Sequence, residues 1–329
     1  MVHSMRLLLG VAVLGAAIAA HVRAEPIPAP SYTPPPPGEK QPAVRTDDAG
    51  WRGRRIVTRR PDVEIVLGGD LSGRRSARAR VGDDVLKVIQ AQDENLLIRL
   101  AGREGWLKKN DAVPLEEAVA YFSEKIKRDP ESSYLYNKRG TIWSFREQYD
   151  KALDDFNTAL RLDPYNVAAH TNQGMIWFYK GNYDKALASQ NEALRLDARY
   201  MPAYSNRGVV WFVKKEYAKA LADYDEALRL DPDHVNARNN RAWLFATCAD
   251  PKYRDHDKAV AEARRACELC FWENAECLDT LAVALAQAGQ FDEAVKLLKK
   301  VLDFPTEDLR RGQKERTRER LKRYEARRP

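Results

Sequence analysis

The sequence lacks the motifs that usually identify hydrolytic and metal-dependent enzymes. No Gly-x-Ser-x-Gly, Ser-x-x-Lys or His-Glu-x-x-His occurs in the 329 residues. Beyond Ala24 the histidines are His170, His234 and His256, and none is paired with a candidate nucleophile. The adjacent acids Asp154 and Asp155 fall on an amphipathic segment, which indicates a solvated helix face and not acid–base chemistry. We therefore predict that the chain is not an enzyme and binds no cofactor.

Long apolar runs are also missing, with one exception at the start of the chain. Residues 7–20 are uncharged and apolar but short for a membrane span, and Arg6 precedes them. Val22, Arg23 and Ala24 place small or tolerated residues around a cleavage site after Ala24. This pattern predicts a signal peptide over residues 1–24 and an exported chain, periplasmic or extracellular, with no transmembrane segment after cleavage. An uncleaved N-terminal anchor is the alternative.

Cysteines are few, and all of them lie in the last third of the chain. They are Cys248, Cys267, Cys270 and Cys277. Export permits disulfides, but four cysteines allow three pairings and the sequence does not choose between them. A thiol metal site with His256 as fourth ligand is one interpretation, but structural zinc sites usually contain two close cysteine pairs and this chain has one. We expect buried thiols, with or without one bridge, and no metal.

A strong charge of one sign is absent as well. The formal net charge is +7, a mild excess that predicts weak attraction to anionic surfaces and no nucleic-acid binding. Prolines concentrate near the start of residues 25–50. Because proline restricts φ and cannot donate a backbone hydrogen bond, this stretch is predicted to be an extended linker.

Residues 51–113 have short apolar segments separated by turn residues. Residues 63–67, 85–89 and 96–100 are predicted strands, and their spacing indicates a small all-β barrel. The last stretch, residues 105–113, resembles the closing segment of bacterial SH3-like domains. Nine arginines at positions 52–80 outnumber the acids there. A solvated charged rim is the favoured explanation, and contact with an anionic envelope polymer or lipid surface is the alternative.

The dominant feature of the chain is a constant step in residue number between similar residues. Three kinds of residue keep this step: Ala118, Ala152, Ala186 and Ala220; Gly140, Gly174 and Gly208; Trp143, Trp177 and Trp211. A fixed period of about 34 residues indicates an array of similar helix pairs. Such arrays usually present surfaces to partners.

These residues carry a family resemblance. Gly140, Trp143, Tyr149, Ala152, Phe156, Ala159 and Pro164 occupy signature positions of tetratricopeptide repeats, and the next two repeats keep most of them. The resemblance implies a mainly α fold, a right-handed solenoid of about five helix-turn-helix repeats preceded by the small all-β SH3-like barrel. The solenoid would span residues 114–305, with a half-repeat at 114–132 and repeats at about 133–166, 167–200, 201–234, 235–274 and 275–305.

Departures from the pattern and the two ends of the array carry further expectations. The second repeat has Gln190 for the bulky residue and Ala198 for the terminal proline, which predicts a less sharply defined turn. The fourth repeat gains about five residues between Ala249 and Asp255. The barrel is expected to cap the open end beside the half-repeat, and residues 306–329 are predicted to form a basic C-terminal capping helix or tail.

One polar column points to a binding site. Lys138, Asn172, Asn206 and Asn240 keep the same step from one repeat to the next. The resemblance implies that they face the concave groove, where an amide can donate to and accept from the backbone of an extended peptide. A purely structural role for these asparagines remains open. A basic carboxylate clamp is not supported, because Asn137, Pro202 and Asn206 stand where such a clamp needs lysine or arginine.

The favoured function is therefore an exported scaffold or adaptor that binds a protein or peptide ligand through the groove. One alternative is an envelope-targeting protein whose SH3-like domain binds peptidoglycan or another anionic wall polymer. A further alternative is an accessory subunit of an export or assembly machine.

Overall fold

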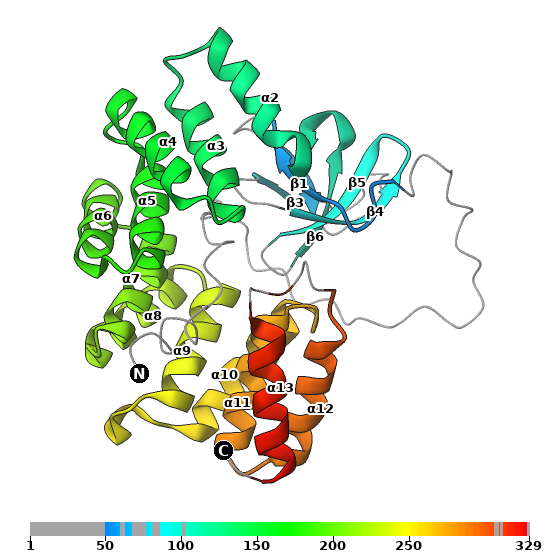
Figure 1. Cartoon of the computed structure of the whole chain (residues 1–329), viewed down its shortest axis with the longest axis vertical. Helices are drawn as coiled ribbons and strands as arrows, with labels where there is room; N and C mark the ends of the chain where they lie inside the picture. Colours follow the sequence, from blue (N-terminus) through cyan, green and yellow to red (C-terminus); the bar gives the residue numbers. More distant parts are fainter. Residues whose placement is uncertain are drawn as a thin grey trace. The chain divides into compact units, whose positions relative to one another are not determined.

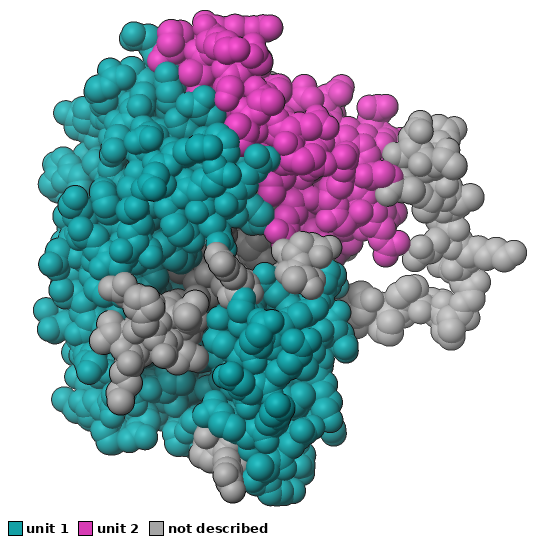
Figure 2. All heavy atoms as spheres, in the orientation of Figure 1, with its two compact units in different colours: residues 1–17, 131–329 teal, residues 18–130 magenta. Residues whose placement is uncertain are grey.

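The computed structural model of the protein describes residues 50–59, 63–67, 77–80, 86–100, 103–305, 309 and 312–327. The predicted signal peptide and all but the last residue of the predicted linker lie outside these residues. The chain divides into two compact units, which meet in the sequence between Pro130 and Glu131 (Figure 2). Among the residues that the structure describes, no helix combines the length and the apolar character needed to cross a membrane.

The first unit is built on an antiparallel sheet. Its strands are β1 (Arg55–Thr58), β2 (Glu64–Leu67), β3 (Ala77–Arg80), β4 (Leu86–Gln92), β5 (Asn95–Leu100), β6 (Arg103–Lys108) and β7 (Ala112–Pro114), in the order β3-β2-β6-β5-β4-β1-β7. Successive side chains of a strand point to opposite faces of the sheet. Leu86 and Val88 are therefore buried, while Lys87 between them is exposed. The predicted small β domain is thus present. Ala79 and Arg80 of β3 pair with Ile65 and Glu64 of β2.

Helix α2 (Leu115–Arg128) belongs to this first unit. Its apolar face contains Ala118 and Phe122, both buried, and the helix contacts β1 and β7. The sequence assigned residues 114–132 to the repeats as a half-repeat, because Ala118 keeps the step of the repeats. In the structure α2 lies in the compact unit that contains the sheet, since an apolar face with helical spacing can pack on a sheet as well as on another helix.

The second unit contains five consecutive helix pairs (Figure 1). The first helices of the pairs are α3 (Ser133–Phe145), α5 (Val167–Tyr179), α7 (Met201–Val213), α9 (Val235–Thr247) and α11 (Ala275–Gln287). The second helices are α4 (Tyr149–Leu162), α6 (Tyr183–Leu196), α8 (Tyr217–Leu230), α10 (His256–Leu269) and α12 (Phe291–Leu302). This arrangement confirms the predicted solenoid of about five repeats.

The packing of the helices shows which side of the array is the inner one. Each first helix contacts the next first helix, from α3 through to α11. Among the described helices, no second helix makes a comparable contact with the next second helix. Elements on the inner side of a curved stack lie closer together than those on the outer side. The first helices therefore form the inner face of the array.

Within a repeat, glycine allows an aromatic ring to lie against the first helix. A Cβ added at Gly140 would stand 2.7 Å from a ring carbon of Phe156, and one at Gly208 would stand 2.6 Å from a ring carbon of Tyr224. Both distances are shorter than a van der Waals contact, so only glycine fits. The second repeat has the buried amide of Gln190 at this place. Its Nε2 donates to the Thr171 carbonyl at 3.0 Å, while its Oε1 is buried without a partner.

An aspartate is the C-cap residue of the second helix in each of the first three repeats. In the first three repeats the cap residues Asp163, Asp197 and Asp231 each accept a hydrogen bond at Oδ1 from the backbone N–H two residues later, at 2.8–3.2 Å. Helix α6 ends at Leu196 with the same cap geometry as its neighbours, although Ala198 replaces the terminal proline. The expectation of a less defined turn there is wrong, because the aspartate side chain makes the turn.

A column of long polar side chains joins the second helices to the first. Arg207 donates from Nε and one terminal nitrogen to Asp223 of its own repeat, and from the other to Asn191 of the preceding repeat. Arg139 makes the same paired bonds to Asp155. Asp155 is 5% exposed, so the expectation that it lies on a solvated face is wrong. Burial raises the pKa of the Asp223 carboxyl more than Arg207 lowers it.

The tryptophan column lies half-buried at the edge of the layers. A lysine of the following second helix stands over each ring, at 4.6 Å from Lys151 Nζ to the Trp143 centroid and 4.3 Å from Lys185 to Trp177. These cation–π contacts let a large ring fill the layer while its outer surface meets a charge.

The two irregular parts of the array have defined structures. In the fourth repeat, a short 3-10 helix, η2 (Pro251–Tyr253), occupies the predicted insertion, and the Asp255 side chain then caps α10. The charged C-terminal segment forms α13 (Gln313–Glu325), which contacts α12. Its buried residues are Gln313, Thr317, Arg320 and Tyr324, and Arg320 pairs with Asp279 of α11.

Candidate functional site

The predicted polar column lies on four first helices of the inner face. Lys138 on α3 is fully buried, with its Nζ 5.8 Å from the centre of the Tyr134 ring. Asn172 on α5 is half-buried. Asn206 on α7 and Asn240 on α9 are each 3% exposed. The column is therefore more deeply buried than a simple surface ladder.

Hydrogen bonds show where the column meets the neighbouring repeat. The Nδ2 of Asn172 donates to Asn137 Oδ1 at 3.1 Å and to Thr141 Oγ1 at 3.4 Å, both on α3. This bridge crosses the contact between two successive first helices. It also identifies a second polar column that was not predicted from the sequence. Each member of this second column stands one residue before a member of the predicted column, and each is 1% exposed: Asn137, Thr171, Ser205 and Asn239.

Helix α9 contains two buried amide oxygens with no hydrogen-bond partner. They are the Oδ1 atoms of Asn239 and Asn240, one from each column. A buried acceptor without a donor destabilises a fold by about 1–3 kcal/mol, so such groups are few in native proteins. The fourth repeat therefore has unused acceptors on the same helix that continues the inner face.

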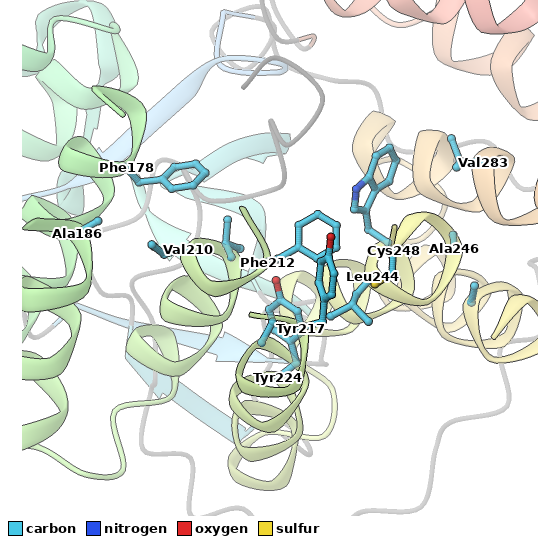
Figure 3. Close-up of a cluster of buried hydrophobic side chains, with 14 of the residues drawn as sticks. Phe178, Ala186, Val210, Phe212, Tyr217, Tyr224, Leu244, Ala246, Cys248 and Val283 are labelled. Atoms are coloured by element: carbon cyan, nitrogen blue, oxygen red, sulfur yellow. The ribbon is translucent and has the colours of Figure 1, made fainter. Parts of the chain in front are cut away.

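Beside the amides, the first helices carry apolar side chains with the same period. Met175, Val209 and Trp243 are one set, at 5%, 1% and 8% exposed. Phe178 and Phe212 form a second, one turn further along their helices. Figure 3 shows Phe178, Phe212 and Ala246 projecting from successive first helices in one continuous apolar cluster. The constant step between these residues could have been found in the sequence, but their changing identity hid it.

The cysteine and histidine side chains form no metal centre in the part of the chain that the structure describes. No group of three or more histidine, cysteine, aspartate or glutamate side chains is placed to hold an ion there. All four cysteines are free thiols. His256, the suggested fourth ligand, instead lines an open pocket of about 540 Å³ beside the insertion, with Arg254 and Gln290.

Two of the described arginines of the first unit, Arg54 and Arg59, make contacts within that unit. Arg54 pairs with Glu116 of α2 at 2.7 Å. Arg59 donates to the Ala112 carbonyl at 3.1 Å and lies 5.3 Å from the centre of the Tyr121 ring. These contacts give the two side chains structural roles.

The comparisons with known proteins agree with this geometry. Sequence models of the tetratricopeptide repeat family match residues 145–200, 202–234 and 274–304. Comparison with curated protein sequences gave no match.

Two of the similar solved structures are named as tetratricopeptide repeat proteins. Yeast Tom70 has a TM-score of 0.50 at 21% identity, over 64% of this chain and 42% of that one, so the match spans less than half of Tom70. A thermophilic repeat protein of Thermus thermophilus has a TM-score of 0.50 at 20% identity, over 59% of this chain and 100% of that one. A repeat protein from Parabacteroides merdae has a TM-score of 0.51 at 17% identity, over 64% and 78% of the two chains.

At these identities the likeness shows the fold alone. The fold supports a role as a protein-interaction scaffold and is typically non-catalytic. Family matches, repeat spacing and five stacked helix pairs lead to one conclusion: this chain contains tetratricopeptide repeats.

Proposed function

We propose that the protein is an exported, non-enzymatic scaffold that binds an extended segment of a protein partner along the inner face of its first helices. The observation that carries the proposal is the pair of unpartnered amide oxygens, Asn239 Oδ1 and Asn240 Oδ1, on α9. Each oxygen is covered in the free chain, so a backbone N–H of a bound segment supplies the missing donor only where the segment displaces the side chains over it.

The neighbouring apolar side chains suit the same kind of ligand. Side chains of an extended segment alternate between its two faces, so one face can meet apolar surface while the backbone meets amides. Met175, Phe178, Val209 and Phe212, on the helices that precede α9, form a buried apolar layer beneath this face. Apolar burial would supply most of the affinity, and the amides would set the register of the segment.

The asparagines differ in a way that makes the proposal testable. Asn172 already bonds to Asn137 and Thr141, so Asn172→Ala is expected to reduce the free energy of unfolding by about 1 kcal/mol. Asn240→Ala removes an unpartnered acceptor, so stability is expected to stay equal or to rise. Partner affinity is expected to fall at least about tenfold for Asn240→Ala and to be lost when Asn172, Asn206 and Asn240 are all alanine.

The measurement begins with a crosslinking pulldown from the native cell, which identifies the partner. Calorimetry with a synthetic segment of that partner then compares the variants, and urea unfolding gives their stabilities. Asn110→Ala, an exposed asparagine in the other unit, is the matched control and should change neither quantity. Unchanged affinity in the triple variant would reject the amide ladder.

Export is the second part of the proposal and rests on residues 1–24. Their basic start, apolar run and small residues before position 25 predict cleavage after Ala24. N-terminal sequencing of the chain from fractionated cells should therefore begin at Glu25 in the exported fraction. A cytosolic chain that begins at Met1 contradicts export.

Binding of the first unit to a wall polymer remains the competing function. Arg54 and Arg59 are engaged within that unit, which weighs against a free basic surface at these two positions. Sedimentation of the full chain with purified sacculi distinguishes the two ideas. Tight sedimentation by a triple asparagine variant would favour the wall polymer.

A further inference from the structure

Three cysteines meet at the turn between α10 and α11. Cys267 is in the last turn of α10, Cys270 is the cap residue that follows it, and Cys277 lies in the first turn of α11. The thiol of Cys270 donates to the Cys267 carbonyl at 3.3 Å. Cys267 and Cys277 are buried in one apolar cluster, and Cys270 packs against the same cluster. The turn thus brings two thiols from different helices together.

The backbone of this turn has an unusual conformation. Phe271 and Trp272 are consecutive non-glycine residues with φ of 55° and 58°. Such left-handed residues persist only where surrounding contacts hold them. Here the Trp272 N–H donates to the Cys267 carbonyl at 2.8 Å, and the Glu273 N–H donates to the Cys270 carbonyl at 3.1 Å. The Asn274 side chain then caps α11 by accepting from the Cys277 N–H at 3.1 Å.

The two facing thiols differ in their ionisation. The pKa of the Cys270 thiol is lowered, mainly by its interaction with Cys277 and against the effect of burial. The pKa of Cys277 is raised well above its usual value, because its S–H donates to Cys270 and the residue is buried. Cys270 is also partly exposed, whereas Cys277 is not. Of the two, Cys270 is therefore the thiol that is more accessible and loses its proton more readily, as the attacking thiol must, and Cys277 is the second thiol that follows.

The other two cysteines are poor competitors. Burial raises the pKa of the Cys267 thiol, which is 0% exposed. Cys248 lies in another apolar cluster, at the end of α9, and burial raises its pKa too. Buried thiols of this kind react slowly.

We propose that Cys270 and Cys277 form a thiol–disulfide exchange site, which a low-molecular-weight disulfide converts into a bridge across the α10–α11 turn. The Cys270 thiolate attacks one sulfur of the small disulfide, forming a mixed disulfide and releasing one small thiolate. Cys277 then gives its proton to solvent and attacks the Cys270 sulfur, which releases the second small thiolate. In total, two protein thiols are oxidised to one disulfide, the small disulfide is reduced to two thiols, and the two protons pass to the leaving groups.

The bridge would join the fourth repeat to the fifth. Its short loop encloses the left-handed turn and the cap of α11, so it would hold these elements together when the chain unfolds. This site is independent of the partner segment proposed for the inner face.

The test incubates the full chain with glutathione disulfide and follows it by intact mass and peptide mapping. Wild type should lose two hydrogens and give one peptide pair joined through Cys270 and Cys277. Cys277→Ser should stop at a single glutathione adduct on Cys270. Cys270→Ser should lose free thiols at least about tenfold more slowly, because the activated thiolate is gone.

Cys248→Ser and Cys267→Ala are the matched controls, and both should still form the bridge. Circular dichroism before oxidation verifies that each variant is folded, and wild-type mapping needs no variant. A bridge through Cys267 or Cys248 would overturn the proposal. So would a folded wild type whose four thiols stay free under conditions that modify the urea-unfolded chain.

Discussion

Replacing Tyr224 by alanine is expected to reduce the free energy of unfolding by about 3–5 kcal/mol. The side chain is 1% exposed, and its ring lies directly over Gly208 in the middle repeat. Truncation leaves a cavity between the two helices that Gly208 cannot fill, and the cluster around Val210 and Leu244 loses contacts (Figure 3). Because repeats in such arrays are stabilised by their neighbours, a central loss should affect the main transition. Urea unfolding followed by circular dichroism measures it.

Two control substitutions test whether the loss of stability comes from the buried position of Tyr224 or from the removal of any tyrosine ring. Tyr224→Phe places at this position the side chain that Phe156 provides in the first repeat, and should change stability by less than about 1 kcal/mol. Tyr165→Ala removes the same kind of ring from a site that is 73% exposed and should stay within about 0.5 kcal/mol of wild type. A loss below about 1 kcal/mol for Tyr224→Ala would contradict the packing described above.

The sequence was sufficient for the parts of the fold that depend on residue size. Alanine at 152 and 220 is 0% exposed, as a close crossing of helices requires. Glycine at 140 and 208 meets an aromatic ring of the second helix. Only a small side chain can occupy such places, so the same residue returns in successive repeats and the period is easy to see.

Interactions between polar side chains were harder to predict, because different pairs of residues occupy the same place in successive repeats. The arginine column contains Gln173 in the second repeat, and its partner there is Ser189 where the first and third repeats have Asp155 and Asp223. A column whose identity changes is not recognised as periodic. For the same reason Asp155 was placed on a solvated face, although Arg139 allows its burial.

The candidate site was predictable in position but not in environment. The step from Asn172 to Asn240 places the column on the first helices, which follows from the repeat alone. Whether each amide is satisfied depends on the preceding helix: α3 offers Asn137 and Thr141 to Asn172, while Asn240 Oδ1 finds no donor. Spacing within one sequence does not contain that information, since it depends on how two helices are positioned in space.

The residue that caps α9 leads to the second large prediction, which is that the folded protein loses stability in acid. His234 caps α9, and its Nδ1 accepts a hydrogen bond from the Ala237 N–H at 3.1 Å. This bond needs a neutral ring with Nδ1 unprotonated. Burial lowers the pKa of His234 to about 4, against the opposing charge of Asp231. The folded chain therefore resists protonation of a group that the unfolded chain protonates near its ordinary pKa of 6.5.

The sign of the effect follows from that difference. The folded pKa is depressed, so the contribution of His234 to stability is fully present above about pH 6.5 and is lost as the pH falls towards 4. At 1.36 kcal/mol per pKa unit, wild type should lose about 2–3 kcal/mol from this group alone between pH 7.5 and pH 4.5. Urea unfolding at the two pH values measures the total loss, to which carboxylates also contribute.

His234→Asn isolates the histidine, because the chain already uses asparagine at the equivalent cap. Asn166 caps α5 by accepting from the Ala169 N–H at 2.9 Å, and it stands two periods of the repeat before His234. The variant keeps an acceptor for the Ala237 N–H but has no proton to gain in this range. Its loss between pH 7.5 and pH 4.5 should therefore be smaller than that of wild type by about 2–3 kcal/mol. Equal losses in the two chains would mean that the His234 ring is hydrated enough in the folded state to accept its proton, and that α9 does not depend on this cap.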